Sequence, residues 1–178
     1  MAHVLERRNE TVIVLLTGGR KSMLVIVPSL LEVNTVTILV LPLNSLIMDY
    51  KHRLAAMGVP YQIYQVDKGL NSRDNLVLVS ADKSQMTHCH TALAYLGCTK
   101  QVAHIVVDEA HIPLIVKGYC RSLENFYNIQ SEPVQLVLLS VTLPPAFMPQ
   151  VFVKIHITYS KAHSSAYEAP TDQSSSTR

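Results

Sequence analysis

The chain has 178 residues, which predicts one domain at the usual size of about 150 residues. Apolar residues make up 48% of it and charged residues only 16%, a composition that excludes a disordered chain, a coiled coil and a basic nucleic-acid-binding tail. The net charge of +2 does not by itself select a polyanionic partner, so any phosphate binding must come from a local arrangement of residues.

The cysteines and the apolar segments indicate the cellular environment of the chain. Cys89, Cys98 and Cys120 cannot all pair with one another and none lies in a C-x-x-C motif, which predicts a reducing, intracellular environment. The apolar run near the start, residues 12–16, is too short for a signal peptide. The longest apolar region, residues 36–48, is interrupted by polar residues and a proline, so no membrane span is predicted.

The first predicted elements are strands. Short runs rich in Val, Ile and Leu recur along the chain without polar alternation, which is typical of strands buried on both faces of a parallel sheet. These runs are residues 12–16, 36–41, 76–79, 105–107 and 134–139. The segments between them are long enough for crossover helices, so the predicted fold class is α/β, with helices on both faces of a mostly parallel sheet.

Four segments are helix candidates. They are residues 23–31, 45–57, 84–96 and 144–152. We expect Pro28 to end or kink the first after about two turns, because proline lacks the N–H that a helix interior needs. Ser45 is the expected N-cap of the second, and Gly58 should stop it. Gly97 should end the third.

The domain boundary is predicted from composition. Residues 1–158 carry all the strand and helix signals and form one lobe. Residues 159–178 are rich in Ser and Thr and lack aliphatic residues larger than Ala, which predicts a disordered tail.

A glycine-containing loop follows the first apolar run. A phosphate-binding loop needs glycines that turn N–H groups inward, a Lys that reaches the phosphates and a Ser or Thr that holds Mg²⁺ at the start of a helix. The residues that fit this pattern are Thr17, Gly18, Gly19, Arg20, Lys21, Ser22 and Met23. The alternative is a Gly-Gly turn followed by a solvated Arg-Lys pair.

Two carboxylates follow the apolar run at residues 105–107. Asp108 and Glu109 begin the sequence D-E-A-H, which ends at His111. At the carboxyl edge of a parallel sheet, Asp can hold Mg²⁺ and Glu can polarise an attacking water. The alternative is an ordinary acidic exit from a strand.

A third motif, S-V-T, ends the run at residues 134–139. Its hydroxyls, on Ser140 and Thr142, can bond to the carboxylates of a neighbouring strand. The alternative is a Ser/Thr cap at the end of a strand.

Together these motifs resemble the first motor domain of superfamily 2 helicases, of the DEAH-containing RecQ type. T-G-G-R-K-S at residues 17–22 is similar to the RecQ T-G-G-G-K-S loop, and residues 41–54 resemble the helix start that touches the DNA backbone. D-E-A-H and S-V-T resemble the DEAH box and the SAT segment. The likeness spans residues 11–152, and its style is most similar to RecQ-related helicases of fungal genomes.

The resemblance implies a RecA-like P-loop lobe that binds ATP and Mg²⁺. By resemblance Lys21 would hold the β- and γ-phosphates, Ser22 and Asp108 would ligate Mg²⁺, and Glu109 would be the catalytic base. His111, Ser140 and Thr142 would couple the nucleotide state to DNA contact, and Asn44, Ser45 and Lys51 would lie near single-stranded DNA. The family implies 3′-to-5′ strand separation on single-stranded DNA or duplexes with a single-stranded end, a role in DNA repair and recombination, and a nuclear location.

Departures from the family pattern limit what this chain is expected to do. Arg20 stands where the loop has glycine, and Val141 stands where SAT has alanine. A second motor domain, with its arginine finger, is not part of the sequence. We therefore expect the isolated chain to bind nucleotide weakly and not to unwind DNA. The alternatives are a catalytically inactive remnant that only binds nucleic acid or protein, and a fragment whose second lobe is encoded nearby.

One further cluster invites a metal interpretation. His88, Cys89 and His90 are consecutive, and Cys98 follows nearby. Zinc ligands usually come as spaced pairs, and consecutive side chains on a helix point in different directions. The favoured interpretation is a partly exposed helix with a buried Cys89.

Overall fold

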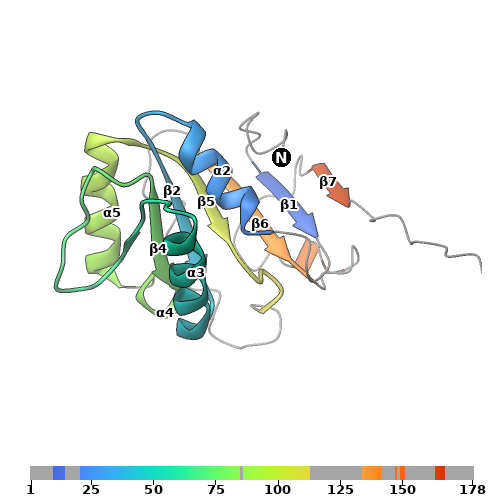
Figure 1. The fold of residues 1–178 in the computed structure, drawn as a ribbon. Helices are drawn as coiled ribbons and strands as arrows, with labels where there is room; N and C mark the ends of the chain where they lie inside the picture. Colours follow the sequence, from blue (N-terminus) through green and yellow to red (C-terminus); the bar gives the residue numbers. More distant parts are fainter. Residues whose placement is uncertain are drawn as a thin grey trace, which may run out of the picture.

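The protein is described by a computed structural model that defines residues 10–14, 21–84, 86–112, 134–141, 147, 149–150 and 163–166. These residues form a single seven-stranded sheet in the order β3-β4-β2-β5-β6-β1-β7, and every pairing in it is parallel (Figure 1). The strands are β1 (Glu10–Val14), β2 (Thr35–Leu41), β3 (Gln62–Ile63), β4 (Leu76–Ser80), β5 (Gln101–Val107), β6 (Gln135–Ser140) and β7 (His163–Ala166). The helices are α2 (Met23–Leu31), α3 (Asn44–Ala56), α4 (Ala81–Ser84) and α5 (Thr87–Thr99).

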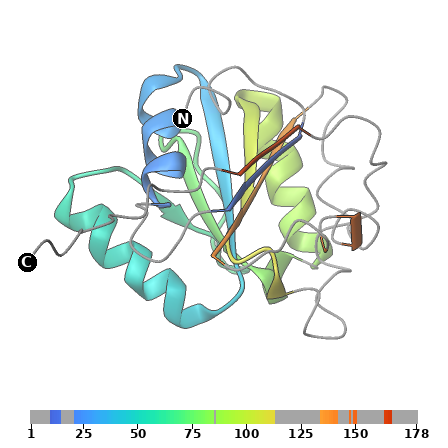
Figure 2. The same ribbon diagram turned by 90° about the vertical axis from the view of Figure 1, so that its right-hand side faces the viewer.

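Helices cover both faces of the sheet, as the continuous apolar runs predict. Helices α2 and α3 lie on one side and α5 lies on the other, which Figure 2 shows. All seven residues of β2 are buried, and their side chains alternate between the two sides. Val36, Ile38 and Val40 pack toward α5, whereas Leu39 and Leu41 pack toward α2 and α3. The predicted fold class is therefore confirmed.

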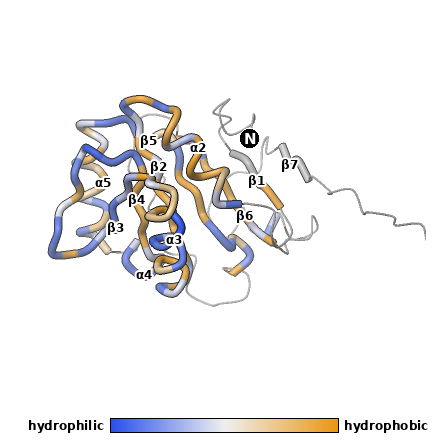
Figure 3. The backbone as a smooth tube through the Cα atoms, in the orientation of Figure 1, coloured by the Kyte–Doolittle hydropathy of each residue, from blue (hydrophilic) through white to orange (hydrophobic). Residues whose placement is uncertain are grey.

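The colouring of Figure 3 shows the same division of the chain. Helix α2 is coloured as hydrophobic, and the loop between β3 and β4 is coloured as hydrophilic. Burial of a large aliphatic side chain contributes roughly 1.5–3 kcal/mol, so the two apolar layers are the main source of stability. No helix within the described ranges has the length and apolar character needed to cross a membrane.

Several predicted element ends differ from the structure. Helix α2 has the expected bounds, Met23–Leu31, with the buried Pro28 inside it at the cost of one backbone hydrogen bond. Helix α5 likewise runs through Gly97 to Thr99. The helix expected over residues 84–96 begins only at Thr87, and Ser84 is instead the last residue of the separate short helix α4. The expected helix over residues 144–152 lies largely outside the described residues.

Helix α3 begins one residue before the expected N-cap. Asn44 is its first residue, and Ser45 therefore lies in the first turn instead of capping the helix. Its other end is as predicted. Gly58 has φ of +65°, the Gly58 N–H donates to Ala55 O, and the Val59 N–H donates to Leu54 O. These two bonds form a Schellman motif, which needs a left-handed residue at this point.

Two strands were not predicted. β3 is only two residues long. β7 lies within residues 159–178, the segment expected to be a disordered tail, and pairs in parallel with β1. Without β7, β1 would be the edge of the sheet, with unpaired N–H and C=O groups that can pair with a polar segment lacking an apolar pattern of its own.

Contacts at both ends of α2 fix its position over β5. At its C-terminal end, Glu32 Oε1 lies 2.9 Å from Nε2 of the buried His104, and His104 Nδ1 lies 2.7 Å from Gln135 Oε1. At its N-terminal end, Lys21 reaches the residues that follow β5, as described next. Helix α2 therefore cannot shift along the sheet without breaking polar contacts at one end or the other.

Candidate functional site

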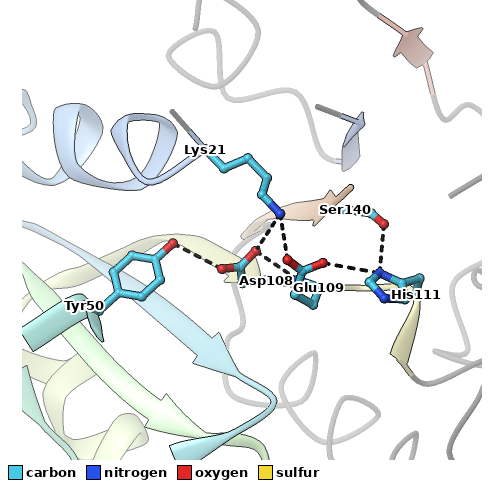
Figure 4. Close-up of polar contacts among 6 residues, drawn as sticks. All are labelled: Lys21, Tyr50, Asp108, Glu109, His111 and Ser140. Atoms are coloured by element: carbon cyan, nitrogen blue, oxygen red, sulfur yellow. Dashed lines mark hydrogen bonds and ion pairs between the residues drawn. The ribbon is translucent and has the colours of Figure 1, made fainter. Parts of the chain in front are cut away.

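The candidate site lies at the carboxyl edge of the sheet, where β5 and β6 end and α2 and α3 begin. Its polar side chains come from four separate elements (Figure 4). In parallel α/β sheets, ligands bind outside the carboxyl ends of the strands, since the loops there converge. A ligand-binding or catalytic site is therefore expected at this edge.

Lys21 meets both carboxylates of D-E-A-H. Its Nζ lies 2.8 Å from Glu109 Oε1 and 3.8 Å from Asp108 Oδ1, although 88 positions separate Lys21 from Glu109. The Lys21 side chain is 15% exposed, so this cation is held mostly away from water. A phosphate that entered the site could replace these two carboxylates as the partner of the Lys21 ammonium group.

Asp108 is the most enclosed of the acidic residues. Its Oδ1 accepts a hydrogen bond from the Glu109 N–H at 2.9 Å, and its Oδ2 accepts one from the Tyr50 hydroxyl at 3.2 Å. Burial raises the pKa of the Asp108 carboxyl above its ordinary value, and the charge on Lys21 and the two hydrogen bonds oppose that rise. Burial, and then the charge of Asp108, raise the pKa of the Tyr50 hydroxyl, so this hydroxyl stays protonated and acts as a donor.

Glu109 has a backbone conformation that residues other than glycine seldom adopt. Its φ is +49°, in the left-handed region, and the neighbouring Ala110 N–H donates to Leu139 O of β6. Left-handed backbone at a residue other than glycine costs roughly 1–2 kcal/mol and concentrates at functional sites. Glu109 Oε2 is buried and accepts no hydrogen bond, although His111 Nδ1 lies 3.3 Å away.

His111 and Ser140 form the other side of the site. The Nδ1 atom of His111 lies 3.0 Å from Ser140 Oγ, at the end of β6. The hydroxyl of Ser140 therefore contacts the histidine, whereas the hydroxyls of S-V-T were expected to bond to the carboxylates of the neighbouring strand. Since His111 also faces Glu109, the end of β6 is linked to the carboxylates through an imidazole.

Part of the expected phosphate-binding loop lies outside the described residues. This holds for Thr17, Gly18, Gly19 and Arg20, and also for Thr142. Ser22 and Met23 are described, at the start of α2, and the Ser22 hydroxyl makes no capping hydrogen bond to that helix. That hydroxyl is thus not committed to the helix end.

The residues expected near DNA lie on α3. Asn44, Ser45 and Lys51 are all exposed, whereas Ile47, Tyr50 and Leu54 are buried. Asn44 and Lys51 are seven residues apart, close to two turns, so they lie on the same side of the helix. The structure therefore places these three polar residues on the solvent side of the helix that follows β2.

The donor set at this edge fits a hard divalent cation. Mg²⁺ prefers oxygen ligands and is bound in proteins through one or two carboxylates, with phosphates and waters completing its shell. The Asp108 carboxylate and the Ser22 hydroxyl, which makes no capping hydrogen bond to α2, are oxygen ligands of this kind. Within the described part of the chain, no three His, Cys, Asp or Glu residues gather into a metal cluster, the His-Cys-His segment included.

Reasoning from the sequence missed Tyr50. Its hydroxyl reaches Asp108 across 58 positions, a contact that none of the sequence motifs includes. A signal was present. Tyr50 is the one polar-tipped residue on the buried face of a helix that starts at the same sheet edge as D-E-A-H.

No protein-family model and no characterised protein sequence matches this chain. Among solved structures, the chain is similar to the Hef helicase domain of Pyrococcus furiosus, with a TM-score of 0.64 and 16% sequence identity. The match covers 95% of this chain and 38% of that one. The two proteins share an α/β fold built on a parallel sheet. At this identity the likeness describes the fold alone, and the chain spans well under half the length of the matched structure.

Proposed function

We propose that this chain is the nucleotide-binding lobe of a helicase of the DEAH-containing RecQ type, and that it binds ATP with Mg²⁺ and single-stranded DNA. The observation that carries the proposal is the meeting of Lys21 with Asp108 and Glu109 at the carboxyl edge of the sheet. A phosphate-binding lysine beside two carboxylates is the arrangement that phosphoryl transfer needs, because catalysis there is mainly positioning and charge stabilisation.

Each residue has a distinct role in this proposal. Lys21 would leave the carboxylates and pair with the phosphates, and Ser22 and Asp108 would hold Mg²⁺. When bound, Mg²⁺ supplies positive charge that neutralises the phosphate oxygens. Glu109 would accept the proton of an attacking water, and the buried Glu109 oxygen that accepts no hydrogen bond is the atom suited to it.

Nucleic acid would contact the exposed side of α3. Backbone N–H groups and hydroxyls position a nucleic-acid strand through its phosphates, and Lys51 adds one positive charge on the same side as Asn44. The chain's net charge of +2 is small, so binding is expected to be weak, with a shallow salt dependence that reflects few phosphate contacts.

Binding of a fluorescent, non-hydrolysable ATP analogue to the purified chain tests the nucleotide part. We expect Mg²⁺ to increase the affinity and Lys21→Ala to lower it by about tenfold, which is 1.4 kcal/mol. Lys68→Ala is the matched control, because Lys68 is exposed in the loop between β3 and β4. Equal affinities for wild type and Lys21→Ala would refute the assignment.

Fluorescence anisotropy of a labelled oligothymidine tests the nucleic-acid part. Lys51→Ala should lower the slope of log affinity against log salt by about 0.7, the value for one contact to a single strand, while Lys68→Ala should leave it unchanged. Steady-state hydrolysis by the isolated chain is expected to be slow, since one lobe cannot close on ATP against another. Oligonucleotide binding without any nucleotide binding would favour the inactive remnant instead.

A further inference from the structure

Tyr50 is the only described residue of α3 that contacts the carboxylates of the site. It is 5% exposed and is one of three buried residues of that helix. Its hydroxyl donates to Asp108 Oδ2 at 3.2 Å, on the opposite side of the carboxylate from Lys21 (Figure 4). The Oδ1 atom takes the Glu109 N–H and faces Lys21. Each oxygen of Asp108 therefore has its own partner.

This division of partners fixes how the carboxylate is turned. Rotation of the carboxylate about its terminal bond would break the bond from Tyr50 and the bond from the Glu109 N–H together. Groups that orient a metal ligand in this way are part of a metal site, and their loss typically lowers metal affinity or activity by about 10- to 100-fold. Tyr50 stands in that relation to Asp108.

The same helix carries the exposed residues proposed to face nucleic acid. Lys51 follows Tyr50 directly, on the solvent side. The bond from Tyr50 to Asp108 is at the long end of the hydrogen-bond range, so a shift of α3 by about 0.4 Å would take it to 3.6 Å, where it is no longer a hydrogen bond. A small movement of α3 therefore makes or breaks the contact.

We propose that Tyr50 is a positioning residue that orients Asp108 for Mg²⁺ and ties this orientation to the position of α3, so that single-stranded DNA on α3 and Mg²⁺-nucleotide at Asp108 influence each other. This inference rests on the proposed function. Because coupling between two binding sites is reciprocal, either ligand reports on it.

Three versions of the full chain test the proposal: wild type, Tyr50→Phe and Tyr64→Phe. Tyr64 is the matched control, since it is also buried but packs on the opposite, α5 side of the sheet. Affinity for the ATP analogue is measured in EDTA, with Mg²⁺, and with Mg²⁺ plus oligothymidine. Circular dichroism and thermal melting establish that each version is folded.

We expect all three proteins to bind the analogue equally in EDTA. The gain in affinity on adding Mg²⁺ should fall by about tenfold in Tyr50→Phe alone. The effect of oligothymidine on Mg²⁺-nucleotide affinity should also disappear in Tyr50→Phe and persist in Tyr64→Phe. A wild type that gains nothing from Mg²⁺ would overturn the proposed function and this inference together. A normal gain in both wild type and Tyr50→Phe would overturn this inference alone.

A second measurement does not depend on the folding of Tyr50→Phe. The chain is made with 3-fluorotyrosine at position 50 only, and its fluorine resonance is followed. The resonance should shift when Mg²⁺-nucleotide is added and again when oligothymidine is added. A resonance that responds to neither addition, in a chain that binds both, would refute the inference.

Discussion

Replacing Asp108 by asparagine should make the fold more stable while it removes the proposed Mg²⁺ ligand. Burial raises the pKa of the Asp108 carboxyl, which means that the folded protein holds the ionised form less favourably than the unfolded chain does. Asparagine keeps the shape of the side chain without the charge. Its oxygen can accept the Glu109 N–H, and its amide can donate to the Tyr50 hydroxyl oxygen, so neither partner is left without a bond.

The expected gain at neutral pH is about 0.5–2 kcal/mol, the range typical of a single stabilising substitution. For a chain of this length, each kcal/mol corresponds to about 2–4 °C in Tm. Urea denaturation and thermal melting of wild type and Asp108→Asn measure the difference. Asp49→Asn is the matched control. Asp49 is 63% exposed and pairs with Arg53 on the surface of α3, so its replacement should change stability by less than about 0.5 kcal/mol.

The pH dependence gives a sharper test. A carboxyl with a raised folded-state pKa contributes stability that is complete below its ordinary value of 3.8 and is lost as the pH rises through the folded-state pKa. The advantage of Asp108→Asn should therefore be full at neutral pH and vanish as the pH falls toward 3.8. An Asp108→Asn protein that is less stable than wild type at pH 7, or an advantage that does not change with pH, would refute the reasoning.

Two further predictions concern the glycines and the cysteines. Gly58→Ala should destabilise the fold by about 1 kcal/mol, because φ at Gly58 is +65°, a backbone conformation that alanine adopts only at a cost. Gly97→Ala should stabilise the fold by about 0.5–1 kcal/mol, because Gly97 lies inside α5 with open space around it. Urea denaturation of both variants measures the two changes in stability, and equal changes would contradict the prediction. In a Cys120→Ser chain, a thiol reagent at pH 8 should modify the exposed Cys98 rapidly and Cys89 only on unfolding, because burial raises the pKa of the Cys89 thiol to about 12. Mass spectrometry of samples taken over time measures the labelling of each cysteine. Rapid labelling of Cys89 in the folded protein would contradict the prediction.

The local sequence was sufficient for most of the strands. Continuous runs of Val, Ile and Leu predicted five of the strands to within a few residues, because a strand buried on both faces must be apolar at every position. The C-terminal end of α3 was also predictable, since only glycine adopts the conformation at residue 58 without cost. Lys21, Asp108 and Glu109 were singled out as candidates from the sequence because their residue types and their place after strands are local signals, and the structure brings their side chains together.

Contacts between residues far apart in the sequence, and backbone conformations that oppose local preference, were decided by the tertiary structure. The sequence places Tyr50 on the buried face of α3, but its bond to Asp108 depends on β2 and β5 being neighbours in the sheet. The left-handed backbone of Glu109 and the passage of α2 beyond Pro28 run against local preference. Both are held by packing and hydrogen bonds from distant strands, and β7 gains its hydrogen-bonded partner only once β1 offers a free edge. Local propensities of about 1 kcal/mol or less set the elements, while contacts between elements far apart in the chain set the site.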